Sequence, residues 1–234
     1  MTIVLTIGLA APANAATPPD TLEQRLAACI ACHANQERSD AYFPRIAGKP
    51  AGYLYNQLRN FRDGRRNYPM MTYMVGQLSD DYLREIAAYF AALHPAYPPA
   101  APGSGSNASA ATLARGRQLV LQGDAGRQLP ACISCHGAAL GGVVGQDAPA
   151  VPGLLGLPSD YINAQFGAWK NGTRRTVAPD CMAAIAGRLE IADVAAVSAW
   201  LSRQPPDVNA RPATGLPAPM PLRCGAATAP RAQP

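Results

Sequence analysis

The chain has 234 residues, of which 48% are hydrophobic and only 15% charged, and its formal net charge is +5 at pH 7. The charge is evenly spread, with nine Lys or Arg against eight Asp or Glu in residues 16–96 and eight against six in residues 111–204. No segment forms a basic run with interleaved aromatic side chains, so we expect no binding to nucleic acid.

The first fifteen residues, MTIVLTIGLAAPANA, form an apolar run that ends in the small-residue sequence Ala13-Asn14-Ala15. This pattern is typical of a secretory signal peptide with a mature start near Ala16. The positively charged segment that opens such signals is missing, so we expect residues 1–15 to be a truncated signal. The run is too short to span a bilayer, and we expect a soluble protein exported to the periplasm.

Helical periodicity occurs in two segments, residues 16–96 and 111–204. A Pro/Gly/Ser-rich linker, residues 97–110, separates the two segments, and a Pro-rich tail, residues 205–234, follows the second. The apolar spacing predicts three helices in each segment, over residues 21–32, 51–63, 79–93, 112–122, 159–171 and 191–202. Ser79 is the expected N-cap of the third helix, and no strand is predicted.

The two segments repeat each other, which indicates a tandem duplication. PRIAGKPAGYL from Pro44 matches PGLLGLPSDYI from Pro152, and MTYMVGQL from Met71 matches MAAIAGRL from Met182. The register of the first match also pairs Gln57 with Gln165, Phe61 with Trp169, and Gly64 with Gly172.

Each copy contains one Cys-x-x-Cys-His motif, CIACH at residues 29–33 and CISCH at residues 132–136. A structural zinc site needs four ligands, and a thioredoxin-like redox pair is expected in a βαβ unit; the sequence offers neither context. Haem attachment uses all three residues, because two thiols add to the vinyl groups and the adjoining imidazole binds the iron. We therefore predict two haem c groups, attached through Cys29, Cys32, Cys132 and Cys135, with His33 and His136 as axial iron ligands.

Methionines downstream of each motif are candidates for the other axial position, where Met raises the reduction potential. The first copy offers Met70, Met71 and Met74, whereas the second offers Met182. Both Met71 and Met182 lie seven residues before the Leu that leads into the last helix. We therefore predict Met71 and Met182 as iron ligands, and Met70 and Met74 as packing residues.

Two such domains, each with a P-x-x-x-G-x-P segment before the middle helix and a Met before the last, resemble the dihaem cytochromes c4. The resemblance covers residues 21–204, and FRDGRR at residues 61–66 is also typical of that family. It implies an all-α fold of two tandem class I cytochrome c-like domains, each wrapped around a covalently attached haem. It further implies a periplasmic carrier of single electrons and not an enzyme.

The resemblance also implies partners and neighbours of the cofactors. The donor would be a cytochrome bc complex or a dehydrogenase and the acceptor a terminal oxidase, with the carrier free or peripheral to the membrane. The carbonyls of Pro44 and Pro152 would accept hydrogen bonds from the ring Nδ1–H of His33 and His136. Guanidinium groups that could meet the haem carboxylates are those of Arg65, Arg66, Arg174 and Arg175.

Two cysteines depart from the family pattern, Cys181 directly before Met182 and Cys224 in the tail. We expect a disulfide between them that holds the tail over the second haem. In the alternative, the Cys181 thiolate replaces Met182 on the iron, and the protein is a thiosulfate-dehydrogenase-like oxidoreductase. A cytochrome subunit of a periplasmic dehydrogenase is a further alternative, because a carrier domain has the same sequence features whether free or docked.

Overall fold

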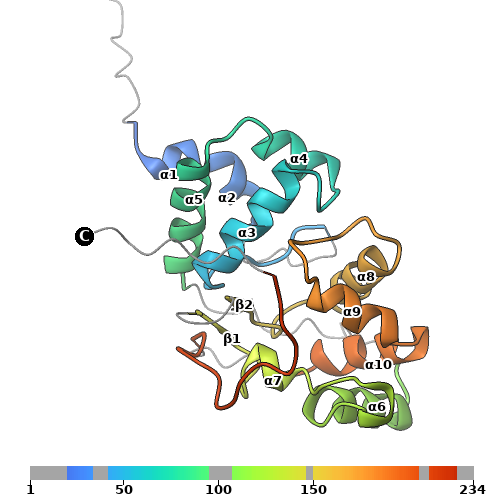
Figure 1. Ribbon diagram of the computed structural model, residues 1–234. Coiled ribbons are helices and arrows are strands. Elements are labelled where there is room, and N and C mark those ends of the chain that lie inside the picture. Colours follow the sequence, from blue (N-terminus) through green and yellow to red (C-terminus); the bar gives the residue numbers. More distant parts are fainter. Residues whose placement is uncertain (1–19, 34–41, 95–106, 146–149, 206–210, 226–234) are drawn as a thin grey trace, which may run out of the picture.

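The computed structural model describes residues 20–33, 42–94, 107–145, 150–205 and 211–225. These residues form two helical bodies that lie one against the other (Figure 1). The predicted signal peptide and most of the predicted linker lie outside the described residues. Within the described residues, no helix is long and apolar enough to cross a membrane.

The first body contains the helices α1 (Leu22–Arg25), α2 (Ala27–His33), α3 (Ala51–Arg62), α4 (Pro69–Val75) and α5 (Asp80–Ala92). The helix predicted over residues 21–32 is interrupted at Leu26, which caps α1 and is 1% exposed in the core. The N-cap prediction for α5 is confirmed, because the Ser79 hydroxyl accepts a 3.2 Å hydrogen bond from the Tyr82 backbone N–H. The buried side chains of this body's core include Leu54, Phe61, Leu83, Ile86 and Phe90.

The second body contains α6 (Ala110–Leu121), the 3-10 turn η1 (Ala125–Arg127), α7 (Ile133–His136), β1 (Gly142–Val143), β2 (Val151–Pro152), α8 (Ser159–Lys170), α9 (Cys181–Arg188) and α10 (Ile191–Leu201). Helices α6 and α10 pack across each other, with Gly116 at their closest approach. The side chains that this crossing buries include Leu119, Val120, Val197 and Leu201.

The prediction of no strand is wrong for the second body. Strands β1 and β2 pair antiparallel, with Gly142 opposite Pro152 and Val143 opposite Val151. Two residues are too few to show the alternation that marks a strand in sequence. Gly142 is required here, because it has φ +93° and an added Cβ would lie 2.6 Å from the Gly153 nitrogen.

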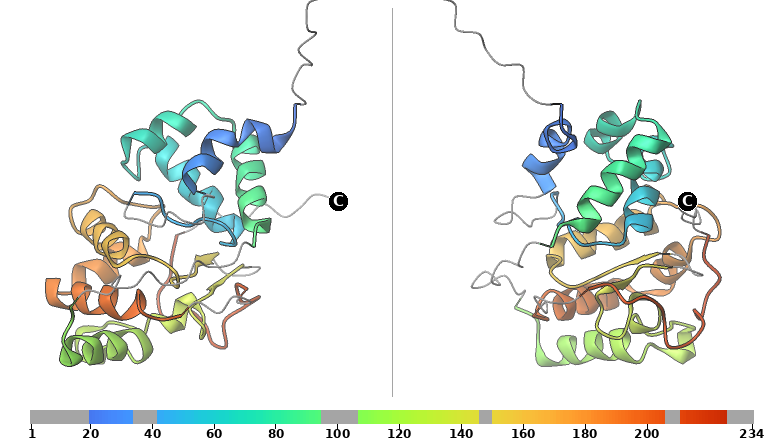
Figure 2. Two further views of the ribbon diagram at one scale, coloured as in Figure 1. Left: turned by 180° about the vertical axis from the view of Figure 1, so that it is seen from behind. Right: turned by 90° about the vertical axis from the view of Figure 1, so that its left-hand side faces the viewer.

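The described part of the Pro-rich tail, residues 211–225, lies along the second body without forming a helix. Ala213 makes a parallel bridge with Val143, and its N–H donates to the Gly142 carbonyl at 2.8 Å. A disulfide then joins Cys224 to Cys181 at the start of α9, with the two Cα atoms 5.3 Å apart. The tail therefore runs from the β1 strand to the start of α9 (Figures 1 and 2).

The duplication is visible in the contacts between the two bodies. Arg66 and Arg174 are equivalent in the repeat, and their backbones form an antiparallel bridge. Two hydrogen bonds of 2.7 Å make this bridge: the Asn67 N–H donates to the Thr173 carbonyl, and the Arg175 N–H donates to the Arg65 carbonyl. Equivalent backbone segments thus meet each other, as expected for two copies related by an approximate twofold axis.

Candidate haem sites

The second motif lies on a short helix next to the β1–β2 pair. Cys132 caps α7, and His136 ends it, with 6% of its surface exposed. The ring Nδ1 of His136 lies 2.8 Å from the carbonyl oxygen of Pro152 in β2. Since a carbonyl can only accept, Nδ1 must carry the proton, and the lone pair stays on Nε2.

Burial fits His136 for metal binding. Loss of solvent lowers its pKa to about 4, against a smaller raising effect of the Pro152 hydrogen bond. The imidazole is therefore neutral at physiological pH, which is the form that binds iron. The Pro152 carbonyl fixes the ring orientation in the way expected for a residue behind a metal ligand.

A cavity of about 230 Å³ opens in front of the second motif. Cys132, Cys135 and His136 lie at its wall together with Met182, the second residue of α9. Asp180 positions this helix, because its carboxylate accepts from the backbone N–H groups of Ala183 and Thr176 at 3.0 and 2.9 Å. The remaining wall is largely apolar, with Leu119, Leu129, Leu157, Ile162, Phe166, Trp169, Ile185, Leu189, Val197 and Leu201.

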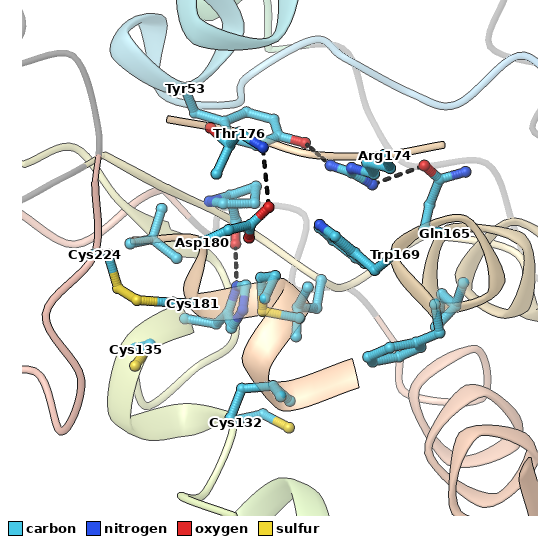
Figure 3. A pocket seen from close by; sticks show the side chains of 18 of the residues that line it. Tyr53, Cys132, Cys135, Gln165, Trp169, Arg174, Thr176, Asp180, Cys181 and Cys224 are labelled. Atoms are coloured by element: carbon cyan, nitrogen blue, oxygen red, sulfur yellow. Dashed lines mark hydrogen bonds between the residues drawn. A yellow bond between two sulfur atoms is a disulfide. The ribbon is translucent and has the colours of Figure 1, made fainter. Parts of the chain in front are cut away.

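This wall fits a flat apolar cofactor bound through two sulfurs and one imidazole. Figure 3 shows Cys132 and Cys135 at one end of the cavity and Tyr53, Gln165 and Arg174 at the other. The thiols therefore lie at one end of the cavity and polar side chains at the other, an arrangement that would suit the carboxylates of a bound haem. The chemistry of the donor set therefore matches haem c.

The histidine of the first motif has the same kind of carbonyl partner as His136. Cys29, Cys32 and His33 lie on α2, and the ring Nδ1 of His33 lies 3.0 Å from the Pro44 carbonyl oxygen. Burial lowers the pKa of His33, so this imidazole also favours the neutral form. Cys29 packs against the core of the first body, whereas Cys32 is exposed.

The three methionines of the first copy lie on α4, a helix that was not predicted. Met70 is 62% exposed, whereas Met71 and Met74 pack against the core. The exposure of Met70 fits an iron ligand poorly, because a bound thioether would be covered by the cofactor. Met71 and Met74 both lie on the side of α4 that faces the core.

The geometry does not favour the two other readings of the motifs. A structural zinc site requires four ligands close together. Among the described residues, no group of three or more His, Cys, Asp or Glu side chains lies close enough to hold a metal ion. A redox-active Cys needs a lowered pKa, but burial raises the pKa of Cys132 to about 12 and also raises that of Cys29 and Cys135. As free thiols these three would be protonated at pH 7, which does not suit a redox-active pair.

The equivalent arginines of the two bodies bind each other's glutamines. Arg66 donates to Gln57 and Gln165, both at 2.8 Å, and Arg174 donates to the same two at 3.2 and 2.7 Å. Each guanidinium also lies over an aromatic ring of its own body, Arg66 over Phe61 and Arg174 over Trp169. Each also donates to a tyrosine hydroxyl of the opposite body: Arg66 to Tyr161, and Arg174 to Tyr53.

The expected disulfide is present in the structure. The Cys181 sulfur is bonded to Cys224 and flanks the cavity in Figure 3. In this state Cys181 has no free thiolate to offer the iron. The tail residues Met220 and Leu222 line the same cavity, so the tail covers part of the second site.

Sequence reasoning missed the residues that the first body contributes to the second cavity. Tyr53, Gln57 and Asn60 on α3, together with Lys49, lie in its wall. Asn60 donates to the Thr176 hydroxyl at 3.1 Å, and Lys49 Nζ donates to the Gly153 carbonyl at 2.8 Å. The only signal in the sequence was a break in the repeat, because Asn60 and Lys49 align with Ala168 and Leu157.

Comparison with known proteins agrees with this arrangement. The cytochrome c family model matches residues 24–94. The chain is 41% identical over 199 residues to a thiosulfate dehydrogenase electron acceptor of Thiomonas intermedia, covering 84% of this chain and 85% of the relative. It is 32% identical to cytochrome c4 of Pseudomonas aeruginosa, in a match that covers 86% of this chain and 96% of the relative.

Two solved structures share the fold. Reduced cytochrome c4 from Pseudomonas stutzeri superposes with a TM-score of 0.60 at 30% identity, covering 76% of this chain and 94% of that one. Thiosulfate dehydrogenase TsdBA from Marichromatium purpuratum superposes with a TM-score of 0.63 at 34% identity. This match covers 76% of this chain but only 36% of the TsdBA chain. The two copies, their paired motifs and these relatives show that the chain belongs to the cytochrome c4 family, electron carriers with covalently bound haem c.

Proposed function

We propose that this protein is a periplasmic dihaem carrier that accepts single electrons from a thiosulfate dehydrogenase and delivers them towards a terminal oxidase. One haem would be held by Cys29, Cys32 and His33 and the other by Cys132, Cys135 and His136. Met71 and Met182 would complete the two iron sites. The relatives named as thiosulfate dehydrogenase electron acceptors, at 41% and 35% identity, support this choice of donor.

The observation that carries the proposal is the shared wall between the two bodies. Residues of α3 in the first body line the cavity of the second motif, and the bridged segments of Arg66 and Arg174 join the two bodies at that point. Two cofactors held by these motifs would therefore lie on either side of one interface. The largely apolar wall of the second cavity suits a group that changes charge by one electron without a change in ligands.

The residues of each site have separable tasks. The bound haem supplies exchange between Fe(III) and Fe(II). Pro44 and Pro152 hold the imidazole rings in one orientation, and the apolar side chains exclude water. The Cys181–Cys224 disulfide fixes the start of α9 and therefore the position of Met182.

The same disulfide argues against the catalytic alternative. An oxidoreductase with a Cys-ligated iron would need the Cys181 sulfur free, whereas it is bonded to Cys224. We therefore propose that the protein receives electrons from the enzyme and does not itself oxidise thiosulfate.

Two measurements on the purified holoprotein test the proposal. Magnetic circular dichroism and a pyridine haemochrome assay should give two low-spin haems with His/Met ligands. In stopped-flow absorbance, thiosulfate alone should leave the oxidised protein unchanged, and addition of a thiosulfate dehydrogenase should reduce both haems. A single haem, or reduction by thiosulfate without the enzyme, would contradict the proposal.

Matched variants of the distal positions sharpen this test. Met71→Leu and Met182→Leu should each remove half of the near-infrared methionine–iron band, whereas Met70→Leu, at the exposed position, should leave it intact. Retention of the full band in Met71→Leu would assign the ligand to Met74 instead.

A further inference from the structure

The end of the described tail forms part of the wall of the second cavity. Met220, Leu222 and Cys224 are half-buried and line this cavity. The residues between them, Pro221 and Arg223, are exposed and do not belong to the wall. Every second side chain of this segment therefore faces the second site, although the segment is neither a helix nor a strand.

The tail is attached to the second body mainly at two places. Ala213 is bridged to Val143 at one place, and Cys224 is bonded to Cys181 at the other. Among the described residues, no backbone hydrogen bond joins residues 214–222 to the rest of the second body. Residues 213–224 are therefore a strap that is fixed at its two ends, one of which is covalent.

The covalent end of the strap lies next to the proposed iron ligand. Cys181 is the first residue of α9 and Met182 is the second. Just beyond the disulfide, the Gly225 N–H donates to the Pro179 carbonyl at 2.8 Å, and the Ala178 carbonyl leaves no room for a side chain at Gly225. The end of the strap and the start of α9 therefore form one unit at the second site.

The first copy has no such covalent end. Its cysteines are the two of its haem motif, and the repeat register aligns Cys181 with Met70, which is 62% exposed. Breaking the disulfide therefore changes the surroundings of the second motif and leaves those of the first unaltered. The first site is a reference within the same molecule.

We propose that the strap keeps external ligands away from the iron of the second site, so that this site exchanges electrons and binds no substrate. An external ligand can reach the iron only when Met182 leaves it, and for this the start of α9 must move. The disulfide holds that start in place, while Met220 and Leu222 close the wall beside it. This inference rests on the proposed two-haem function and gives the tail a task in it.

Carbon monoxide binding to the fully reduced holoprotein, followed by stopped-flow absorbance, tests the proposal. Ascorbate reduces the haems and leaves the disulfide intact. Dithiothreitol also breaks the disulfide, because both cysteines are partly exposed: two electrons and two protons pass to the sulfur atoms of Cys181 and Cys224, and the dithiol closes to a cyclic disulfide. A thiol titration verifies the two new thiols, since the motif cysteines are held in thioether bonds.

The second haem should bind carbon monoxide at least about tenfold faster after dithiothreitol than after ascorbate, because local opening then no longer works against a covalent bond. The first haem should bind at the same rate in both samples. Cys181→Ser reduced with ascorbate should behave like the parent treated with dithiothreitol. The methionine methyl resonances in NMR spectra, assigned with Met71→Leu and Met182→Leu, show which haem has exchanged its ligand.

Variants that keep the disulfide separate the cover from the covalent bond. Met220→Ala combined with Leu222→Ala removes two side chains from the wall and should also speed binding at the second haem, though by less than loss of the disulfide. Arg223→Gln is the matched control, because this exposed residue of the same strap lies outside the wall. It should leave the rate unchanged.

The outcomes separate this inference from the proposed function. A haem count of one would overturn the proposed function itself. Two haems, with the same rate at the second haem whether the disulfide is intact or broken, would overturn the inference alone. An equal acceleration at both haems would also overturn it, because that result would indicate a general loosening of the fold.

Discussion

The crossing of α6 and α10 depends on the missing side chain of Gly116, and Gly116→Ala tests this dependence. An added Cβ would lie 2.1 Å from the Ala196 carbonyl oxygen and 2.8 Å from the Cβ of Trp200, both below the 3.0 Å that real Cβ atoms keep. Inside a helix Ala is favoured over Gly by about 1 kcal/mol. Overpacking costs about 1–3 kcal/mol and occasionally more. The clash here is with backbone, which cannot rotate away, so we expect a net destabilisation of about 2 kcal/mol.

Gly167→Ala is the matched control, because Gly167 lies inside α8 and an added Cβ meets nothing within 4 Å. It should stabilise the protein by about 0.5–1 kcal/mol. Guanidinium unfolding of the holoproteins, followed by far-ultraviolet circular dichroism and Soret absorbance, measures both changes. The two variants should move the unfolding midpoint in opposite directions. A midpoint for Gly116→Ala at or above that of the parent would refute the close crossing.

Two further predictions concern the second body. Cys181→Ser should lower the free energy of unfolding by about 4 kcal/mol, the chain-entropy value for a disulfide that spans 43 residues, while the methionine–iron band of both haems stays as in the parent protein. A parent protein in which the second haem lacks this band and acquires it in Cys181→Ser would instead indicate Cys181 on the iron. Asp193 accepts from Arg127 at 2.6 Å and from Arg115 at 2.9 Å. Burial raises its pKa, but these hydrogen bonds outweigh burial and the pKa is lowered below 3.8. A carboxylate with a lowered pKa stabilises the fold at pH above its unfolded value and loses this effect as the pH falls through its folded value. Asp193→Asn should therefore cost about 1.5–3 kcal/mol at pH 7, and the cost should shrink as the pH falls through the lowered pKa of Asp193. Urea unfolding over a series of pH values measures it, and a cost that does not change with pH would contradict the ion-pair explanation.

The long helices could be predicted because each has an apolar stripe and a clear end. Helix α5 is the clearest case, since Ser79 caps it and Asp80 and Asp81 occupy its first turn. Helices α4 and α9 were missed because they have seven and eight residues, about two turns, which is too short to show a period. Pro69 at the start of α4 and Asp180 before α9 were the available signals.

Some residues of the candidate sites could likewise be predicted from the sequence, whereas others could not. The Cys and His positions follow from covalent chemistry with a fixed spacing, so the sequence is enough to propose them. The hydrogen bonds from His33 to Pro44 and from His136 to Pro152 were expected from the family resemblance and are present. The contacts of Arg66 with Gln165 and of Lys49 with Gly153 arise only when the two bodies dock. No local pattern encodes such contacts, so a single sequence could not have predicted them.

The duplication also explains why departures from the repeat are informative. Two identical domains across a twofold axis would have two identical sites. In this chain, the departures at Lys49 and Asn60 and the disulfide at Cys181 all lie at the second cavity. The symmetric contacts of Arg66 and Arg174 can hold the two bodies together without favouring either site. It is therefore at the second site, where the repeat is broken, that the surroundings of the two motifs differ.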